Sequence, residues 1–252
     1  MKELLKTLDL SVGYDGTAVA GPFDVPIYKG EVLTLIGPNG AGKTTLLKTL
    51  AKLLAPVAGT VLLDEEDLNV TKPLELAKRM AVVFSDALRP EQMTCREAVA
   101  VGRYPYTGRF GRLSEEDERI IDEVMEQVHV TELQDRPFTA ISDGQRQRVV
   151  LARALCQQPE IILLDEPTTF LDIRWKAEFL EALKDLSETQ NKTVLMTLHE
   201  PELARLVSDR VACIREGRLD RLGSPGEVFE GRYIAHLFGL DETLYDKWFG
   251  ES

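Results

Sequence analysis

A glycine-rich segment that ends in lysine and threonine carries the clearest chemistry in the sequence. It reads GPNGAGKT and directly follows the apolar run at residues 31–36. Its glycines allow backbone N–H groups to turn inward around phosphate groups, while Lys43 brings a positive charge to the β and γ phosphates. The Thr44 hydroxyl is suited to Mg²⁺, and the positive end of a following helix would point at the anion. We predict a nucleotide site in this segment, called the phosphate loop, formed by Gly37, Pro38, Asn39, Gly40, Ala41, Gly42, Lys43, Thr44 and Thr45.

Two acids at the end of another apolar run could complete this chemistry. In IILLDEPTT, at residues 161–169, Asp165 is suited to holding Mg²⁺ through water and Glu166 to polarising an attacking water molecule. A similar run places Asp64 and Glu65 after VLL, but it lacks the following proline and threonines, so we interpret that pair as a solvated turn. We therefore expect Asp165 to help hold the metal and Glu166 to act as the catalytic base.

The residues around these motifs predict an alternation of strands and helices. Apolar, β-rich runs predict strands at residues 31–36, 60–63, 80–84, 161–164, 193–198 and 210–215. After the phosphate loop, leucines at helical spacing predict a helix that continues to Leu54, shortly before Pro56. Strands that alternate with helices are typical of an α/β fold with a mainly parallel sheet.

The middle of the chain differs because its apolar spacing is helical. One helix there should be capped by Ser114, with Asp117 three residues later, ahead of an apolar stripe. We interpret this stretch as a helical subdomain inserted between two strands of a nucleotide-binding core, and we expect a tail with a helix that packs back. The predicted core is residues 1–87 and 159–225, the helical subdomain is residues 88–158, and the tail is residues 226–252.

Composition limits the partners. The 252 residues are 44% apolar and carry a net charge of −12, which disfavours nucleic acid or an anionic membrane surface as the main partner. The three cysteines, Cys95, Cys156 and Cys213, form no CxxC pair, so we expect reduced thiols in a cytosolic protein. No stretch approaches the roughly 20 apolar residues of a membrane span, and Lys6 and Asp9 break the first apolar run, unlike a signal peptide. If the protein serves a membrane, we expect a partner to hold it there.

The segment ISDGQRQRVVLARAL, at residues 141–155, resembles the signature of the ATP-binding-cassette family, where a serine–glycine–glycine–glutamine turn opens a helix. The order of motifs extends this resemblance over nearly the whole chain. It implies a P-loop NTPase core with a mainly parallel sheet, an inserted helical subdomain and an N-terminal antiparallel β portion. In the family this turn faces the ATP of the opposite subunit, which implies a head-to-tail pair around two ATP molecules. The signature turn here consists of Ser142, Asp143, Gly144 and Gln145.

Three further residues match family positions. Tyr14 lies where an aromatic residue stacks on the adenine, and His199 follows a strand where the family has the histidine that senses the γ-phosphate. Asp172 ends TTFLD, residues 168–172, which resembles the loop that crosses the dimer interface and is called the dimer loop. The alternatives are an ordinary half-buried tyrosine at Tyr14, a structural histidine at His199, and a simple capping box for the signature turn.

Two positions depart from the family pattern. Asp143 replaces the first signature glycine, which places a carboxylate beside the partner's phosphates. Ser85 replaces the glutamine expected after the strand MAVVF, so a shorter side chain stands where one should reach Mg²⁺ and water. Both departures bear on the rate of hydrolysis and not on the class of protein. The predicted Mg²⁺ residues are Thr44, Asp165 and, more weakly, Ser85.

The stretch TCREAVAVGRYPYTGRFGRLSEED resembles the permease-contacting region of importers for iron chelates, haem and vitamin B12. Its aromatic and basic residues, Arg103, Tyr104, Pro105 and Tyr106, suit a protein contact, although a local core turn is the alternative. The resemblance implies a Mg²⁺-dependent ATPase motor at the inner face of the cell membrane. Its partners would be permease subunits, a second ATPase subunit, most simply a copy of itself, and indirectly an extracytoplasmic binding protein. The alternatives are an efflux motor, a cassette protein without a transport role, and a P-loop kinase.

Overall fold

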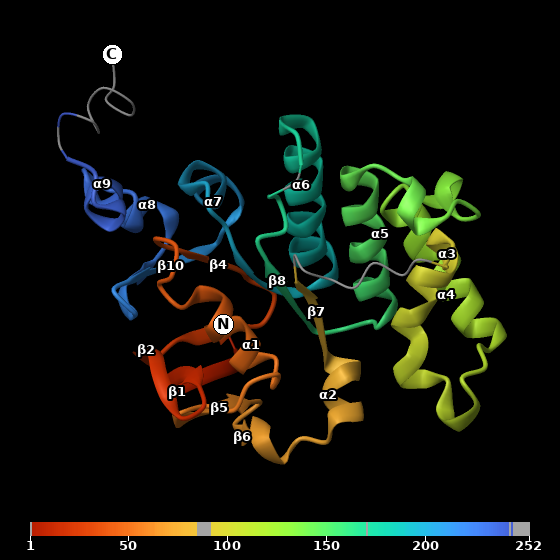
Figure 1. Cartoon of the computed structure of the whole chain (residues 1–252), viewed down its shortest axis with the longest axis horizontal. Coiled ribbons are helices and arrows are strands. Elements are labelled where there is room, and N and C mark those ends of the chain that lie inside the picture. Colours follow the sequence, from red (N-terminus) through yellow and green to blue (C-terminus); the bar gives the residue numbers. More distant parts are fainter. Residues whose placement is uncertain (1, 85–91, 170, 242, 244–252) are drawn as a thin grey trace. The chain divides into compact units, whose positions relative to one another are not determined.

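The computed structural model of the chain describes residues 2–84, 92–169, 171–241 and 243. The chain forms two compact units (Figure 1). The first unit comprises Met1–Val70 and Leu195–Ser252, and the second comprises Thr71–Val194. Across the described residues, no helix has the length and apolar character needed to cross a bilayer.

An antiparallel sheet occupies the N-terminal part of the first unit. Its strands are β1 (Glu3–Tyr14), β2 (Thr17–Phe23), β3 (Pro26–Tyr28), β5 (Ala58–Leu63) and β6 (Glu66–Asp67). They pair in the order β2-β1-β5-β6, and β3 also pairs with β1. Every one of these pairings is antiparallel. The antiparallel β portion expected at the N-terminus is therefore confirmed.

A second group of strands in this unit positions the phosphate loop. All residues of β4 (Val32–Ile36) are buried, which is typical of a strand covered on both faces. It pairs in parallel with β10 (Arg210–Arg215), and β10 pairs in an antiparallel manner with β11 (Arg218–Gly223). The phosphate loop leaves the end of β4, and its last three residues form the start of α1 (Lys43–Leu50). The strand–loop–helix order predicted for the nucleotide site is confirmed.

The C-terminal part of the first unit is helical. α7 (Pro201–Val207) precedes β10 in the chain. Two further helices, α8 (Pro225–Val228) and α9 (Tyr233–Phe238), follow β11. In α9, Tyr233 and Leu237 are buried. The predicted tail helix is therefore present and packs back onto the protein.

The second unit is built on two strands with a helical stretch between them. β7 (Met80–Phe84) and β8 (Ile161–Asp165) are parallel, with Phe84 opposite Asp165 at their ends. The described residues between them, 92–160, are mostly helical, as their apolar spacing predicted (Figure 1). The helices of this unit include α2 (Pro73–Arg79), α3 (Cys95–Ala100), the 3-10 helix η2 (Val101–Tyr106), α4 (Glu115–Gln127), α5 (Asp143–Cys156) and α6 (Ile173–Gln190). The chain then passes through β9 (Thr193–Thr197) into the first unit.

The start of α4 matches its prediction in detail. The Ser114 side chain accepts a hydrogen bond from the Asp117 N–H, and the Asp117 carboxylate accepts one from the Ser114 N–H, which forms a capping box. The apolar stripe that follows is buried. Local sequence therefore fixes both where this helix begins and which face it buries.

The helix after the phosphate loop ends earlier than predicted. α1 stops at Leu50, and the N–H groups of Leu53 and Leu54 both donate to the Lys48 carbonyl. Lys52 adopts a left-handed conformation with φ 59°, which reverses the chain before Leu53. Leu53 is 60% exposed, so it does not belong to the buried face of the helix. The leucine spacing thus continues past the residue at which the helix ends.

Candidate nucleotide-binding site

The phosphate loop has a backbone conformation that requires glycine. At Gly37, with φ 150°, an added Cβ would lie 2.0 Å from the Ile214 carbonyl oxygen. At Gly42, with φ 96°, it would lie 2.5 Å from the Ala20 Cβ. Gly40 also has a positive φ but faces open space. The loop is thus closely backed by β10 and β2, and its N–H groups can turn toward a bound anion.

Lys43 is held inside this loop. Its ammonium donates to the carbonyls of Gly37, at 2.7 Å, and Pro38, at 2.9 Å. The residue is buried, with 5% of its surface exposed. A buried positive charge is costly unless it is paired, so an anion seated in the loop would stabilise it further. These residues fit the triphosphate of a nucleotide.

Tyr14 lies next to the first turn of α1. Its hydroxyl is 3.4 Å from the Thr45 hydroxyl, and the residue is 46% exposed. The side chain is therefore fixed at its tip and accessible along its ring. This placement is compatible with stacking on a base whose phosphates lie in the loop.

His199 emerges at the same end of the strands as the phosphate loop. The N–H of the preceding residue, Leu198, donates to the Leu35 carbonyl at 3.2 Å, so this segment runs beside the end of β4. The loop begins two residues after Leu35, and His199 itself is exposed. Within the first unit, Tyr14 thus lies beside the phosphate loop, and the segment that leads to His199 runs beside the strand that leads into this loop.

The two predicted acids lie in the second unit. Asp165 is the last residue of β8 and is 5% exposed. Glu166 has a φ of 50°, a left-handed conformation that is uncommon for a side chain other than glycine and that often occurs at functional sites. The Thr169 hydroxyl donates to the Glu166 carbonyl at 3.2 Å and lies 3.4 Å from its carboxylate. Ser85, predicted to approach Mg²⁺, lies outside the described residues.

The signature turn opens α5 with a capping box. The Ser142 side chain accepts from the Gln145 N–H at 3.3 Å, and the Gln145 side-chain oxygen accepts from the Ser142 N–H at 3.1 Å. The Asp143 carboxylate accepts a hydrogen bond from the guanidinium of Arg146. Sequence reasoning missed this ion pair, although an acid and a base three residues apart on a helix are neighbours. The departure at Asp143 therefore comes with its own counter-charge.

The dimer loop ends in a helix cap. One carboxylate oxygen of Asp172 accepts from the Trp175 N–H at 3.0 Å and so starts α6. Thr168 is buried, and its carbonyl accepts from the Leu171 N–H at 3.1 Å. The acidic pair at Asp64 and Glu65 is the turn between β5 and β6, as interpreted from the sequence.

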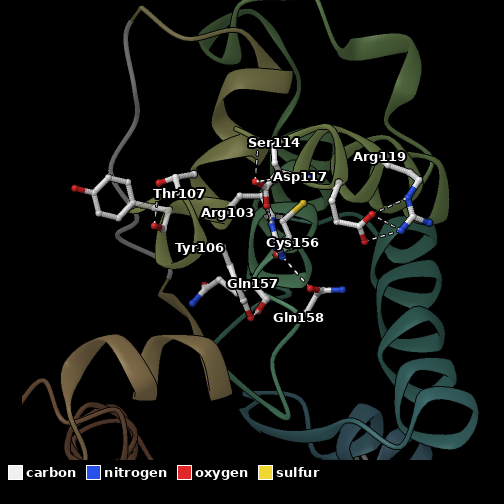
Figure 2. A network of polar contacts seen from close by, with 11 residues as sticks. Arg103, Tyr106, Thr107, Ser114, Asp117, Arg119, Cys156, Gln157 and Gln158 are labelled. Atoms are coloured by element: carbon white, nitrogen blue, oxygen red, sulfur yellow. Dashed lines mark hydrogen bonds and ion pairs between the residues drawn. The ribbon is translucent and has the colours of Figure 1, made fainter. Parts of the chain in front are cut away.

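The expected contact patch around η2 is wrong for Arg103. This residue is 4% exposed, and its guanidinium donates to Asp117 at 2.7 Å and to the Cys156 carbonyl at 2.7 Å (Figure 2). It also donates to the Gln158 side chain at 3.0 Å. Burial acts to raise the pKa of Asp117, but hydrogen bonds from Ser114 and Arg103, together with the Arg103 charge, hold that pKa below its usual range.

Tyr106 belongs to the same buried cluster, and Tyr104 does not. The Tyr106 hydroxyl donates to the Gln157 carbonyl at 2.9 Å, and the Arg103 guanidinium lies 3.9 Å from the centre of its ring (Figure 2). In contrast, Tyr104 is 74% exposed, and Phe110, six residues later, is 85% exposed. Arg103 and Tyr106 thus form the local core turn that was the alternative, and of the four residues in the expected patch Tyr104 is exposed and Pro105 is half-buried.

The chain is similar to known proteins over most of its length. Residues 21–169 match the family described as ABC transporter. An ABC transporter ATP-binding protein of Methanocaldococcus jannaschii is 42% identical over 98% of this chain and 85% of its own length. The iron(3+)-hydroxamate import ATP-binding protein FhuC of Bacillus subtilis is 37% identical over 95% of this chain and 89% of its length. The ferric enterobactin transport ATP-binding protein FepC of Escherichia coli is 37% identical over 96% of this chain and 89% of its own length.

Solved structures show the same fold. A dimeric ATP-binding cassette bound to ADP and phosphate superposes with a TM-score of 0.78, at 27% identity over 88% of this chain and 99% of that one. An inward-facing ABC transporter of the metal-chelate type gives a TM-score of 0.83, at 25% identity over 94% of this chain and 90% of that one. The predicted fold class, a P-loop NTPase core with an antiparallel β portion and a helical part, is confirmed.

Proposed function

Because the chain belongs to the ABC transporter family and is one of its ATP-hydrolysing subunits, we propose that it drives uptake of an iron chelate or cobalamin through a separate permease. The observation that carries this proposal is the extent of similarity to import subunits. Relatives named for import of iron(3+)-hydroxamate and of cobalamin, and for transport of ferric enterobactin, match more than nine-tenths of this chain. The phosphate loop around Lys43 supplies the ATP site that such a motor needs.

In the proposed site, the chain's own residues divide the work. The phosphate loop and Lys43 bind and orient the triphosphate, and Tyr14 stacks on the adenine. Thr44, Asp165 and Ser85 would hold Mg²⁺, which neutralises charge on the β and γ phosphates. Glu166 polarises the attacking water as general base, and His199 contacts the γ-phosphate.

We propose that the working form is a head-to-tail homodimer. Ser142, Asp143, Gly144 and Gln145 of one subunit would face the ATP bound to its partner, and Asp172 would cross the interface in the dimer loop. The dimeric cassette structure, 27% identical to this chain, supports this arrangement. The dimer would sit on the inner face of the cell membrane beneath its permease, with an extracytoplasmic binding protein delivering the solute and no nucleic acid involved.

The test is transport by cells that carry the chain with its permease and binding protein. We expect accumulation of radiolabelled iron, supplied as a hydroxamate siderophore or as ferric enterobactin, or of cobalamin, to require the wild-type chain. Lys43→Ala should abolish both ATP binding and accumulation because it removes the charge that holds the triphosphate. Higher accumulation in cells that carry Lys43→Ala would instead identify an efflux motor, and unchanged ATP affinity would refute the site assignment.

A further inference from the structure

The side chain of Trp175 touches the signature turn, while its backbone is bound to the dimer loop. We infer that Trp175 is a positioning residue that sets the spacing between these two loops and so controls closure around the partner's ATP. This inference rests on the proposed function, in which both loops face the other subunit. Neither the sequence motifs nor the family resemblance assigned a role to this residue.

The contact on the signature side depends on the absence of a side chain at Gly144. A Cβ added there would lie 3.2 Å from both Cδ1 and Cγ of Trp175 and 3.5 Å from its Nε1. Gly144 is buried, so the indole covers the first turn of α5 directly. The helices α5 and α6, which carry Gly144 and Trp175, lie side by side in Figure 1. Glycine is needed here for close approach of the ring, in addition to any role toward nucleotide.

The contact on the dimer-loop side is a main-chain hydrogen bond. The Trp175 N–H donates to the Asp172 carboxylate at 3.0 Å and fixes the first turn of α6 to the end of the loop. The loop itself is held by the bond from the Leu171 N–H to the Thr168 carbonyl. One residue therefore links Asp172 to Gly144, and a displacement of either loop is transmitted to the other.

The indole is held in position by charged neighbours. The Arg148 guanidinium lies 4.3 Å from the centre of a Trp175 ring, and that of Arg174 lies 5.4 Å away. Arg148 also donates to the His129 carbonyl just beyond α4 at 3.1 Å. A cavity of about 780 Å³ that Trp175 helps to line extends beside the ring. Because that side is open, removing the indole should release Gly144 without collapsing the packed core.

The expected consequence is specific to closure. ATP binding to one isolated subunit depends on the phosphate loop and should not change when Trp175 is altered. Dimer formation requires the signature turn and the dimer loop to meet the partner together, so it should weaken when their spacing is no longer fixed. A residue that only stabilises the fold would not separate these two quantities.

The test uses Glu166→Gln as the parent, because this variant should accumulate as an ATP-bound dimer. We expect Trp175→Ala to raise the dimer dissociation constant by about tenfold, in line with couplings between residues in contact. The ATP affinity of the monomer should stay within about twofold, and Trp175→Phe should restore most of the dimer because a ring still covers Gly144. Leu183→Ala is the matched control, since Leu183 is fully buried in the same helix.

Each outcome has a distinct meaning. An unchanged dimer dissociation constant for Trp175→Ala, or an equal increase for Leu183→Ala, overturns the inference and leaves the proposed function intact. A parent that forms no dimer with ATP refutes the proposed dimer and the inference with it. If Trp175→Ala does not fold, the fluorescence of Trp175 in a Trp248→Phe background provides the second measurement. Its emission should change on ATP-driven dimerisation, and an emission that does not respond contradicts the inference.

Discussion

The ion pair in the signature turn predicts opposite mutational effects on dimerisation. Asp143 and Arg146 pair at the start of α5, where 59% of the Asp143 side chain is exposed. In the proposed dimer this turn faces the partner's ATP, so the carboxylate repels the triphosphate while the guanidinium attracts it. The wild-type turn should therefore be nearly neutral toward the nucleotide, and removing either charge should unbalance it.

The size of each effect follows from Coulomb's law. For one phosphate charge about 8 Å away, at an effective dielectric constant of about 20, each unit charge contributes about 2 kcal/mol. Because the group is exposed and the Debye length at physiological salt is about 8 Å, we expect about 1 kcal/mol to remain, or about fivefold in the dimer dissociation constant. Asp143→Asn should tighten the ATP-bound dimer by that factor, and Arg146→Gln should weaken it.

The assay is the dimer dissociation constant, measured by sedimentation in a Glu166→Gln background at low and high salt. The double variant should return close to the wild-type value, and both single effects should shrink as salt increases. Arg146→Lys is the matched control, because it keeps the charge but loses the hydrogen bond that Arg146 donates to the Ile141 carbonyl. An effect as large in Arg146→Lys as in Arg146→Gln would assign the loss to that bond instead of to the charge.

The isolated subunit should respond with the opposite sign. Asp143→Gly removes a carboxylate near a helix N-terminus, worth about 0.3–1 kcal/mol, and an exposed ion pair worth about 0.2–1 kcal/mol. We therefore expect a lower melting temperature together with a tighter dimer. If neither Asp143→Asn nor Arg146→Gln changes dimerisation, the reasoning is refuted, and the carboxylate serves only the helix.

Four further predictions concern the site and the buried cluster. Glu166→Gln should bind ATP normally but lose roughly 10²–10⁴-fold in hydrolysis, the contribution of a general base, and near wild-type turnover would place the base elsewhere. Ser85→Gln should leave ATP affinity unchanged and preserve or raise the hydrolysis rate, whereas a collapse would show that the site is built around serine. Arg103→Ala should cost about 3–5 kcal/mol in denaturant unfolding, because it leaves Asp117 buried without its partner. The folded-state pKa of Asp117 is lowered, so its ionised form stabilises the folded protein. Its contribution to the free energy of unfolding, measured against Asp117→Asn, should be complete above about pH 4 and should be lost as the pH falls further.

Features carried by neighbouring residues were predictable from the sequence. The phosphate loop needs glycines at fixed offsets because its backbone approaches Ile214 and Ala20, and that requirement is visible as a motif. The caps at Ser114 and Ser142 depend on residues three positions later, which the sequence also displays. Local geometry imposes local spacing, and these predictions needed nothing else.

Features that depend on distant residues were not predictable in this way. Arg103 is buried because Asp117 and Cys156, 14 and 53 positions away, both bind it. Without that knowledge, an arginine between glycine and tyrosine has the composition of a surface contact. The contact of Trp175 with Gly144 spans 31 positions, and no periodicity links them. Burial of a charge is decided by tertiary partners, which a single sequence does not reveal.

The buried arginine cluster also fixes one end of α5. Arg103 anchors the C-terminal end of this helix at the Cys156 carbonyl, and the signature turn lies at the other end, 14 residues or about 21 Å away. The exposed Tyr104 follows Arg103 directly in the chain, so a partner that binds Tyr104 would lie beside the residue that anchors the C-terminal end of α5.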